Sequence, residues 1–205
     1  MRNTQVLMVA EWLLEQLRPG CERIEIAGSL RRGKPEVHDI EIVAMPYSKA
    51  PIPVFGNKII DKTMLDRNLR YLEEDVMLKK VKGGDKYKQF LVKRWEEFGL
   101  EEPPNPFMLD LFVVTPPAQW GVQMVIRTGP NKPENNFSQW MVTQRSKGGA
   151  LPDNCRVMDG AVWLHPEVTG RSEIIQMLEE KDFFQFCDLE WMEPGERVAK
   201  WMKNL

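Results

Sequence analysis

Histidine and cysteine are scarce in this sequence, and their scarcity excludes several kinds of site. The chain holds 2 histidines in 205 residues, so a histidine-rich metal centre or a Ser-His-Asp triad has little material to draw on. The three cysteines, Cys21, Cys155 and Cys187, lie far apart without zinc-type spacing, and their odd number argues against a disulfide framework. We expect them to be small buried hydrophobic residues.

Long apolar runs and a basic surplus are also missing. No apolar run approaches the roughly 18 residues that a membrane span requires, and the N-terminus lacks the features of a secretion signal. These observations predict a cytoplasmic protein that does not enter a membrane. The 28 Lys and Arg residues stand against 30 Asp and Glu residues, for a net charge of −2. Nucleic-acid-binding proteins usually carry excess positive charge, so any such surface here must be local.

The hydrophobic residues, 42% of the chain, suffice for one domain or for two small ones. Their spacing indicates both helices and strands, which predicts an α+β fold. Helices are predicted at 6–17, 61–75, from Pro116 to about 128, at 134–145, and at 171–180 as an exposed amphipathic helix. Strands are predicted at 22–27, 37–45, 107–114 and near 157 and 162, with a hairpin over 76–92 that turns at Gly83-Gly84.

Two acidic residues stand two positions apart in the strand predicted at 37–45. At this spacing the side chains of Asp39 and Glu41 project from the same face of the strand. At about 4 Å, two such charges repel by roughly 1 kcal/mol in water and nearer 4 kcal/mol at an effective dielectric of 20. Asp110 poses a related problem, because it stands in the apolar strand predicted at 107–114, where an unpaired charge is costly.

A divalent cation shared by Asp39, Glu41 and Asp110 would resolve both problems. Ligation by oxygen alone suits Mg²⁺, with Mn²⁺ as a substitute, and waters and substrate phosphates would complete the octahedron. The alternative is that each carboxylate pairs with a nearby arginine on the surface.

The turn that follows the strand predicted at 22–27 reads AGSLRRG and comes just before these carboxylates. Gly28 and Ser29 would expose backbone N–H groups where a helix opens, and such groups bind phosphate oxygens. Arg31 and Arg32 add positive charge beside them. A triphosphate and a metal ion could therefore meet at this turn.

The run AGSLRRGKPEVHDIEIV resembles the palm of family X DNA polymerases, a branch of the nucleotidyltransferase superfamily. MLDLFVV is similar to the strand that bears the third catalytic aspartate, and the stretch ending in Thr128-Gly129 resembles the turn at which the thumb begins. KDFFQFCDLEWMEPGERV is similar to the closing segment of the family. The resemblance implies a minimal form, with a nucleotidyltransferase palm at 1–117, built on a mixed sheet with flanking helices, and a small α/β thumb at 118–205.

The resemblance also implies roles for individual residues. Asp39, Glu41 and Asp110 would be the catalytic residues and would hold two Mg²⁺ ions. Gly28, Ser29 and Arg32 would bind the β- and γ-phosphates of a dNTP. Thr128 and Gly129 would also belong to the nucleotide site.

The hairpin KVKGGDKYKQF lies in a basic stretch and resembles a family hairpin that touches template DNA. Lys82, Lys86 and Lys88 would then contact DNA phosphates, and the alternative is a solvated hairpin face. The expected activity is DNA-directed DNA synthesis by a monomer that fills short gaps on a primer-template or gapped duplex.

Departures from the family pattern at Ile126-Arg127, together with the acidic pI of about 5.9, keep a second activity open. Glu41 stands where these polymerases usually have aspartate, and Ile126-Arg127 stand where many relatives carry an aromatic pair. The asparagine that often reads the incoming base has two candidates, Asn135 and Asn136. The alternative is a template-independent nucleotidyltransferase that acts on RNA, a protein or a small molecule. A nucleic-acid-binding module without catalysis is the third possibility.

Overall fold

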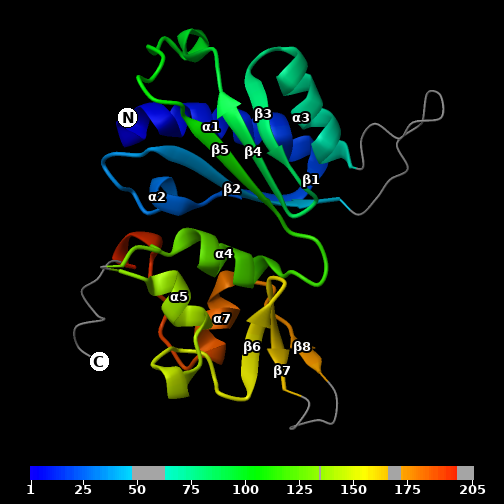
Figure 1. Ribbon diagram of the computed structural model, residues 1–205, viewed down its shortest axis with the longest axis vertical. Coiled ribbons are helices and arrows are strands. Elements are labelled where there is room, and N and C mark those ends of the chain that lie inside the picture. The colour runs from blue at the N-terminus through cyan, green and yellow to red at the C-terminus, as the bar shows by residue number, and fades with distance from the viewer. Residues whose placement is uncertain (48–62, 134, 166–171, 198–205) are drawn as a thin grey trace, which may run out of the picture. The chain divides into compact units, whose positions relative to one another are not determined.

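The computed structural model of the protein describes residues 1–47, 63–133, 135–165 and 172–197, which fall into two compact units (Figure 1). The first unit comprises Met1–Leu30 and Lys34–Val113, and the second comprises Arg31–Gly33 and Val114–Leu205. The change of unit at Val114 lies close to the division expected after residue 117. The inclusion of Arg31–Gly33 in the second unit was not indicated by the sequence.

The first unit is a five-stranded mixed sheet with helices. The strands are β1 (Cys21–Ile26), β2 (Asp39–Pro46), β3 (Leu78–Gly83), β4 (Tyr87–Val92) and β5 (Met108–Val113). Their order is β1-β2-β5-β4-β3, in which β2 and β5 are parallel and all other neighbours are antiparallel. The helices are α1 (Asn3–Leu17), α2 (Gly28–Arg31) and α3 (Met64–Glu74), with short 3-10 helices at Arg18–Gly20 and Trp95–Phe98.

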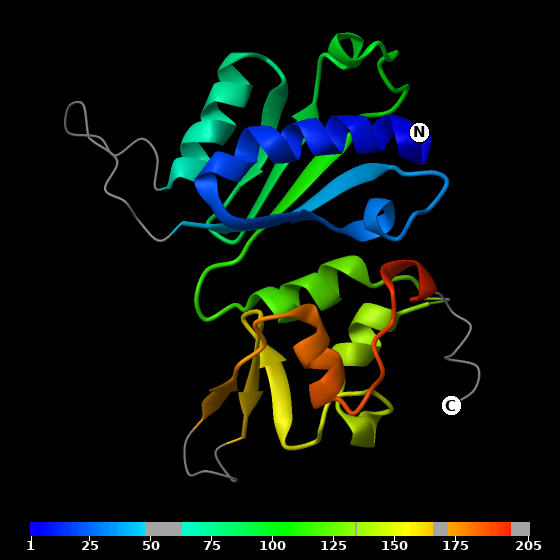
Figure 2. The same ribbon diagram turned by 180° about the vertical axis from the view of Figure 1, so that it is seen from behind.

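Helices α1 and α3 cover one face of this sheet, as Figure 2 shows from behind. Six apolar residues of α1 and three leucines of α3 are buried at helical spacing, so both helices contribute to the core of the unit. Thr63 caps α3 by accepting a hydrogen bond from the backbone N–H of Asp66 at 3.1 Å. Residues 61 and 62, where this helix was expected to begin, lie outside the described residues.

The second unit is a small α/β assembly with its own core. Its helices are α4 (Trp120–Thr128), α5 (Phe137–Val142) and α7 (Glu180–Phe186), with 3-10 helices at Arg145–Lys147 and Pro194–Glu196. Its three-stranded sheet has the order β6-β7-β8, made of Cys155–Met158, Ala161–Leu164 and Glu173–Ile175. With the five-stranded mixed sheet and its flanking helices, this second sheet confirms the predicted α+β class.

Two helix predictions in the second unit need correction. The segment expected as an amphipathic helix at 171–180 contains strand β8, which pairs with β7 through Ile175 and Val162. The helix expected at 134–145 is the shorter α5, which Asn136 caps by accepting a bond from the backbone N–H of Gln139. In both places, tertiary pairing and local capping override the apolar spacing, as is common for short elements.

All three cysteines are free and buried, which confirms the expectation that they act as small hydrophobic residues. Burial raises the pKa of the thiols of Cys21 and Cys187 to about 12, so both are protonated at neutral pH. Within the described ranges, no helix combines the length and the apolar character that a membrane crossing requires.

Candidate active site

The three carboxylates singled out by the sequence belong to two neighbouring parallel strands of the first unit. In the register of β2 and β5, Glu41 lies directly beside Asp110, and Asp39 lies beside Met108. All three acidic side chains are half-buried. They share one face of the sheet. Asp39 and Glu41 are two residues apart on β2, and Glu41 and Asp110 are direct neighbours on adjacent strands, so in each pair the side chains point to the same side.

The opposite face of the same strands explains this placement. Ile40, Ile42, Leu109 and Leu111 alternate with the acidic residues and are fully buried in the core beneath α1 and α3. A shift of either strand by one residue would place the charges in that core, so burial of the apolar residues fixes the register. The carboxylates therefore lie on the face of the sheet that α1 and α3 leave uncovered.

The Asp110 carboxylate is held by two neighbours on β4. Gln89 lies directly across from Asp110 in the antiparallel pair and donates from Nε2 to Oδ1 at 2.9 Å. The Tyr87 hydroxyl donates to the same oxygen at 2.6 Å. The tyrosine ring is stacked on Phe112, with centroids 5.3 Å apart, which fixes its direction. The charge in the apolar strand is thus satisfied in part by neutral hydrogen-bond donors.

The arrangement of these residues fits a divalent ion in some respects only. Among the described residues, no three Asp, Glu, His or Cys side chains are gathered closely enough to form a metal-binding group. Glu41 and Asp110 are nevertheless adjacent, and Asp39 lies one pleat away, about 7 Å along the strand. The donor set is all carboxylate oxygen, which suits Mg²⁺ or Mn²⁺. The ligand atoms are of the right chemical type and lie on the same face of the sheet. The side chain of Asp39 would have to rotate to reach an ion bound between Glu41 and Asp110.

Gly28 lies against the carboxylate of Glu41. The chain leaves β1 through Ala27, whose N–H donates to the Glu41 carbonyl at 2.8 Å, and Gly28 then adopts a left-handed φ of +63°. A Cβ atom at Gly28 would overlap the carboxylate group of Glu41. Glycine is therefore required at this position both by the backbone conformation and by the close approach of the acidic side chain.

Alanine at Gly28 is expected to lower the free energy of unfolding and to displace Glu41. The left-handed conformation alone costs about 1–2 kcal/mol for a residue with a Cβ, and the clash adds to it. The matched control is Gly99→Ala, because Gly99 has a φ of +67° and a Cβ atom there would meet nothing within 4 Å. The urea midpoint of unfolding should be lower for Gly28→Ala than for Gly99→Ala. Equal midpoints would contradict the contact with Glu41.

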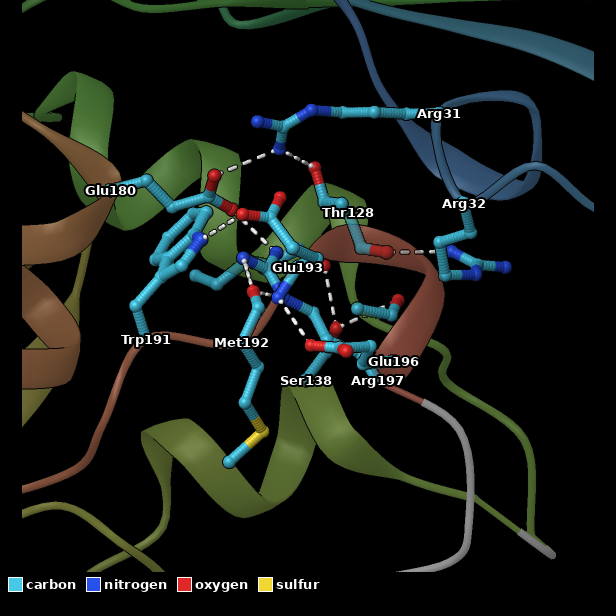
Figure 3. A network of polar contacts seen from close by, with 12 residues as sticks. Arg31, Arg32, Thr128, Ser138, Glu180, Trp191, Met192, Glu193, Glu196 and Arg197 are labelled. Carbon is cyan, nitrogen blue, oxygen red and sulfur yellow. Dashed lines mark hydrogen bonds and ion pairs between the residues drawn. The ribbon is translucent and has the colours of Figure 1, made fainter.

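The helix that follows Gly28 is short. Helix α2 spans only Gly28–Arg31, so it offers little of the dipole expected for phosphate binding, and Ser29 on it is half-buried. Its last residue, Arg31, and the two residues that follow group with the second unit, where Figure 3 shows the contacts of Arg31 and Arg32. The Arg31 guanidinium donates to the Thr128 hydroxyl at 2.7 Å, and Arg32 donates to the Thr128 carbonyl, also at 2.7 Å.

A buried ionic network lies next to these arginines in the second unit (Figure 3). Glu180, only 6% exposed, forms ion pairs with Arg31 at 2.9 Å and with Arg197 at 2.6 Å. The Arg197 side chain is fully buried and also donates to the Met192 carbonyl. Burial lowers the pKa of the Arg197 guanidinium, and the charge of Glu180 acts in the opposite direction.

Aromatic rings complete the surroundings of Arg197. Its guanidinium lies 5.0 Å from the ring centroids of Phe184 and Trp191 and 5.6 Å from that of Phe137. The Arg197 carbonyl accepts a bond from the buried amide of Asn135 at 3.0 Å. Arg197 therefore connects α5, α7 and the segment of Trp191 within the second unit.

The other residues expected at the nucleotide site have structural partners in the second unit. Thr128 and Gly129 are both buried, and Ser138 donates to the Gly129 carbonyl at 3.0 Å. Asn135 is engaged with Arg197 and Asn136 caps α5. Thr128 and Gly129 thus have structural roles in this unit, and their contact with a nucleotide stays a prediction.

The three lysines of the hairpin differ in their surroundings. Lys82 is exposed and lies across from Gln89, so it shares the face of Asp110. Lys86 is exposed in the turn. Lys88 is half-buried and forms an ion pair with Asp66 of α3 at 3.0 Å, on the opposite face of the sheet. Lys82 and Lys86 remain the better candidates for DNA contacts.

Sequence reasoning did not identify Tyr87, Gln89, Glu180 or Arg197 as parts of a site. The period-2 alternation of β4 places Tyr87 and Gln89 on one face and could have suggested a shared partner. The pairing of Glu180 with Arg197 leaves no comparable pattern, because the two residues belong to separate elements. A scan against protein-family models and a search of curated proteins both found no match to the chain.

Proposed function

We propose that this chain is a metal-dependent nucleotidyltransferase of the family X type, a DNA-directed DNA polymerase that fills short gaps. The registered pair of Glu41 and Asp110, on one face with Asp39 and against Gly28, is the observation that supports the proposal most. Carboxylate oxygens on one face of the sheet are ligands that suit divalent cations, and two Mg²⁺ ions are the expected cofactor, with Mn²⁺ as a substitute. The first unit would be the palm and the second the thumb.

In this proposed reaction, different residues bind the metal ions and the triphosphate. Asp39, Glu41 and Asp110 supply oxygen ligands, and Ser29 and Arg32 hold the β- and γ-phosphates of a dNTP. When bound, the ions activate the primer 3′ hydroxyl and neutralise charge on the departing pyrophosphate. The 3′ oxygen forms a bond to the α-phosphorus, the bond to the pyrophosphate oxygen breaks, and the hydroxyl proton passes to solvent.

Two parts of the chain provide positioning in this proposal. Gly28 lets the phosphate-binding turn approach Glu41 closely, since a side chain there would overlap the carboxylate. Thr128 fixes Arg31 and Arg32 through its hydroxyl and its carbonyl. On the DNA side, exposed Lys82 and Lys86 would contact backbone phosphates, so binding should weaken as salt rises.

Single-nucleotide extension on a gapped DNA duplex tests the proposal. With Mg²⁺ and one triphosphate at a time, the chain should add the nucleotide that matches the template, and should prefer the gap to a single-stranded primer. Omission of the divalent ion should abolish extension. Template-matched addition supports the proposal, and absence of any transfer contradicts it.

A template-independent transferase is the second candidate, and the replacement of the usual aromatic pair by Ile126-Arg127 favours it. Ile126 packs on the core of the second unit, so no aromatic ring from this position screens the sugar of a nucleotide. Addition that ignores the template base, or that prefers ribonucleotides, would support this activity on RNA, protein or small-molecule acceptors. Duplex binding without metal uptake would instead indicate a binding module.

A further inference from the structure

The two hydrogen bonds received by Asp110 converge on one of its carboxylate oxygens. Gln89 and Tyr87 both donate to Oδ1, at 2.9 and 2.6 Å, from the strand on the side away from Glu41. The donors recorded at Oδ1 are uncharged, so they orient the carboxylate while the negative charge of Asp110 remains available to a cation.

The β-sheet fixes both donors in place. Gln89 is the direct cross-strand partner of Asp110, while Tyr87 lies diagonal to it and opposite Phe112. The stacking of the Tyr87 ring on Phe112, with an interplanar angle of 29°, holds the hydroxyl at the carboxylate. The Asp110 carboxylate therefore has restricted rotation, because Tyr87 and Gln89, which donate to it, are themselves held in place.

We propose that Tyr87 and Gln89 are positioning residues that make Asp110 a ligand through Oδ2 alone, which selects a small octahedral cation over Ca²⁺. This inference rests on the metal site of the proposed function. An oxygen that already accepts two hydrogen bonds is a poor second ligand atom, so Asp110 is disfavoured as a bidentate ligand. Mg²⁺ requires near-ideal octahedral geometry and Mn²⁺ also favours six oxygen ligands, whereas Ca²⁺ takes 6–8 ligands and readily uses carboxylates in bidentate mode.

Direct cation binding tests this inference without any measurement of activity. The full chain, without DNA or nucleotide, is titrated with Mn²⁺ by electron paramagnetic resonance and with Ca²⁺ by calorimetry. Tyr87→Phe and Gln89→Met each remove one donor and retain the size of the side chain. Each should weaken Mn²⁺ binding about tenfold, the lower end of the range for partners of a metal ligand, and should weaken Ca²⁺ binding less.

The control is Tyr71→Phe, which removes a tyrosine hydroxyl from the exposed face of α3. It should leave both affinities unchanged. Tyr87→Phe is the critical variant, because it keeps the stacking on Phe112 and so preserves the strand. A lower ratio of Mn²⁺ to Ca²⁺ affinity in Tyr87→Phe supports the inference. Unchanged Mn²⁺ affinity, or an equal loss for the two cations, overturns it.

A separate variant distinguishes failure of the inference from failure of the proposed function. Asp110→Asn should greatly weaken Mn²⁺ binding if Asp110 is a ligand at all. If Asp110→Asn binds Mn²⁺ like the wild type, the metal site itself is wrong and the inference falls with it. If Asp110→Asn loses Mn²⁺ while Tyr87→Phe and Gln89→Met keep it, only the positioning role is overturned.

Discussion

Replacement of Asp110 by asparagine should reduce single-nucleotide extension on a gapped duplex by on the order of a thousandfold. The charge stabilisation provided by a metal ion is worth several kcal/mol, and about 1.4 kcal/mol corresponds to a factor of ten in rate. Asparagine keeps an amide oxygen that can accept bonds from Tyr87 and Gln89. The variant should therefore fold normally while losing the anionic ligand oxygen. The measurement is the rate of nucleotide addition at saturating dNTP, together with circular dichroism.

The matched control is Asp75→Asn, which changes an exposed aspartate at the end of α3 in the same unit. Its extension rate should equal that of the wild type. If Asp110→Asn keeps wild-type activity, the carboxylates of β2 and β5 are not the catalytic centre. The loss of activity should also appear in Asp39→Asn, because both residues would bind the same pair of ions.

Removal of Glu180 should destabilise the second unit strongly. In Glu180→Ala, the fully buried guanidinium of Arg197 would lose its carboxylate partner, and Arg31 would lose one of its contacts. Breaking a buried ion pair from one side typically costs about 3–5 kcal/mol in the free energy of unfolding. Urea denaturation, followed by tryptophan fluorescence, should show a lower midpoint, since Trp191 packs against Arg197 in this unit.

Two further variants test whether the unpaired charge of Arg197 causes the lower stability of Glu180→Ala. Combining Glu180→Leu with Arg197→Met removes both charges, and it should restore much of the stability because no buried charge is left alone. Asp188→Asn disrupts the solvent-exposed pair with Arg145 and should leave the midpoint nearly unchanged. A wild-type midpoint for Glu180→Ala would show that the Glu180 pairs contribute nothing to stability.

Much of the first unit could be predicted from the sequence because its elements are long and strongly patterned. Helix α1 and the hairpin of β3 and β4 lie where the spacing of apolar residues and the Gly83-Gly84 turn place them. The alternation in β2 was enough to place Asp39 and Glu41 on one face. It could not place Asp110 beside Glu41, since that pairing depends on the register between strands far apart in the chain.

The second unit was predicted less well, for the same physical reason. Its strands have three or four residues, and β8 acquires its conformation from pairing with β7. Short segments carry too little periodicity to distinguish a strand from a helix. The burial of Arg197 also depends on tertiary structure, because the rings that surround it come from three separate parts of the unit.

The open edge of the first sheet has a consequence for handling the protein. Among the strands of the described residues, β3 has a neighbour on one side only. Its exposed residues Lys79, Lys80 and Lys82 flank Val81, which is 50% exposed. Charged side chains on such an edge prevent two copies from joining through their backbones. Replacing these lysines together by neutral residues would thus favour association of several molecules into extended sheets. Replacing them by glutamate would keep like charges on the edge, so the molecules would still repel one another.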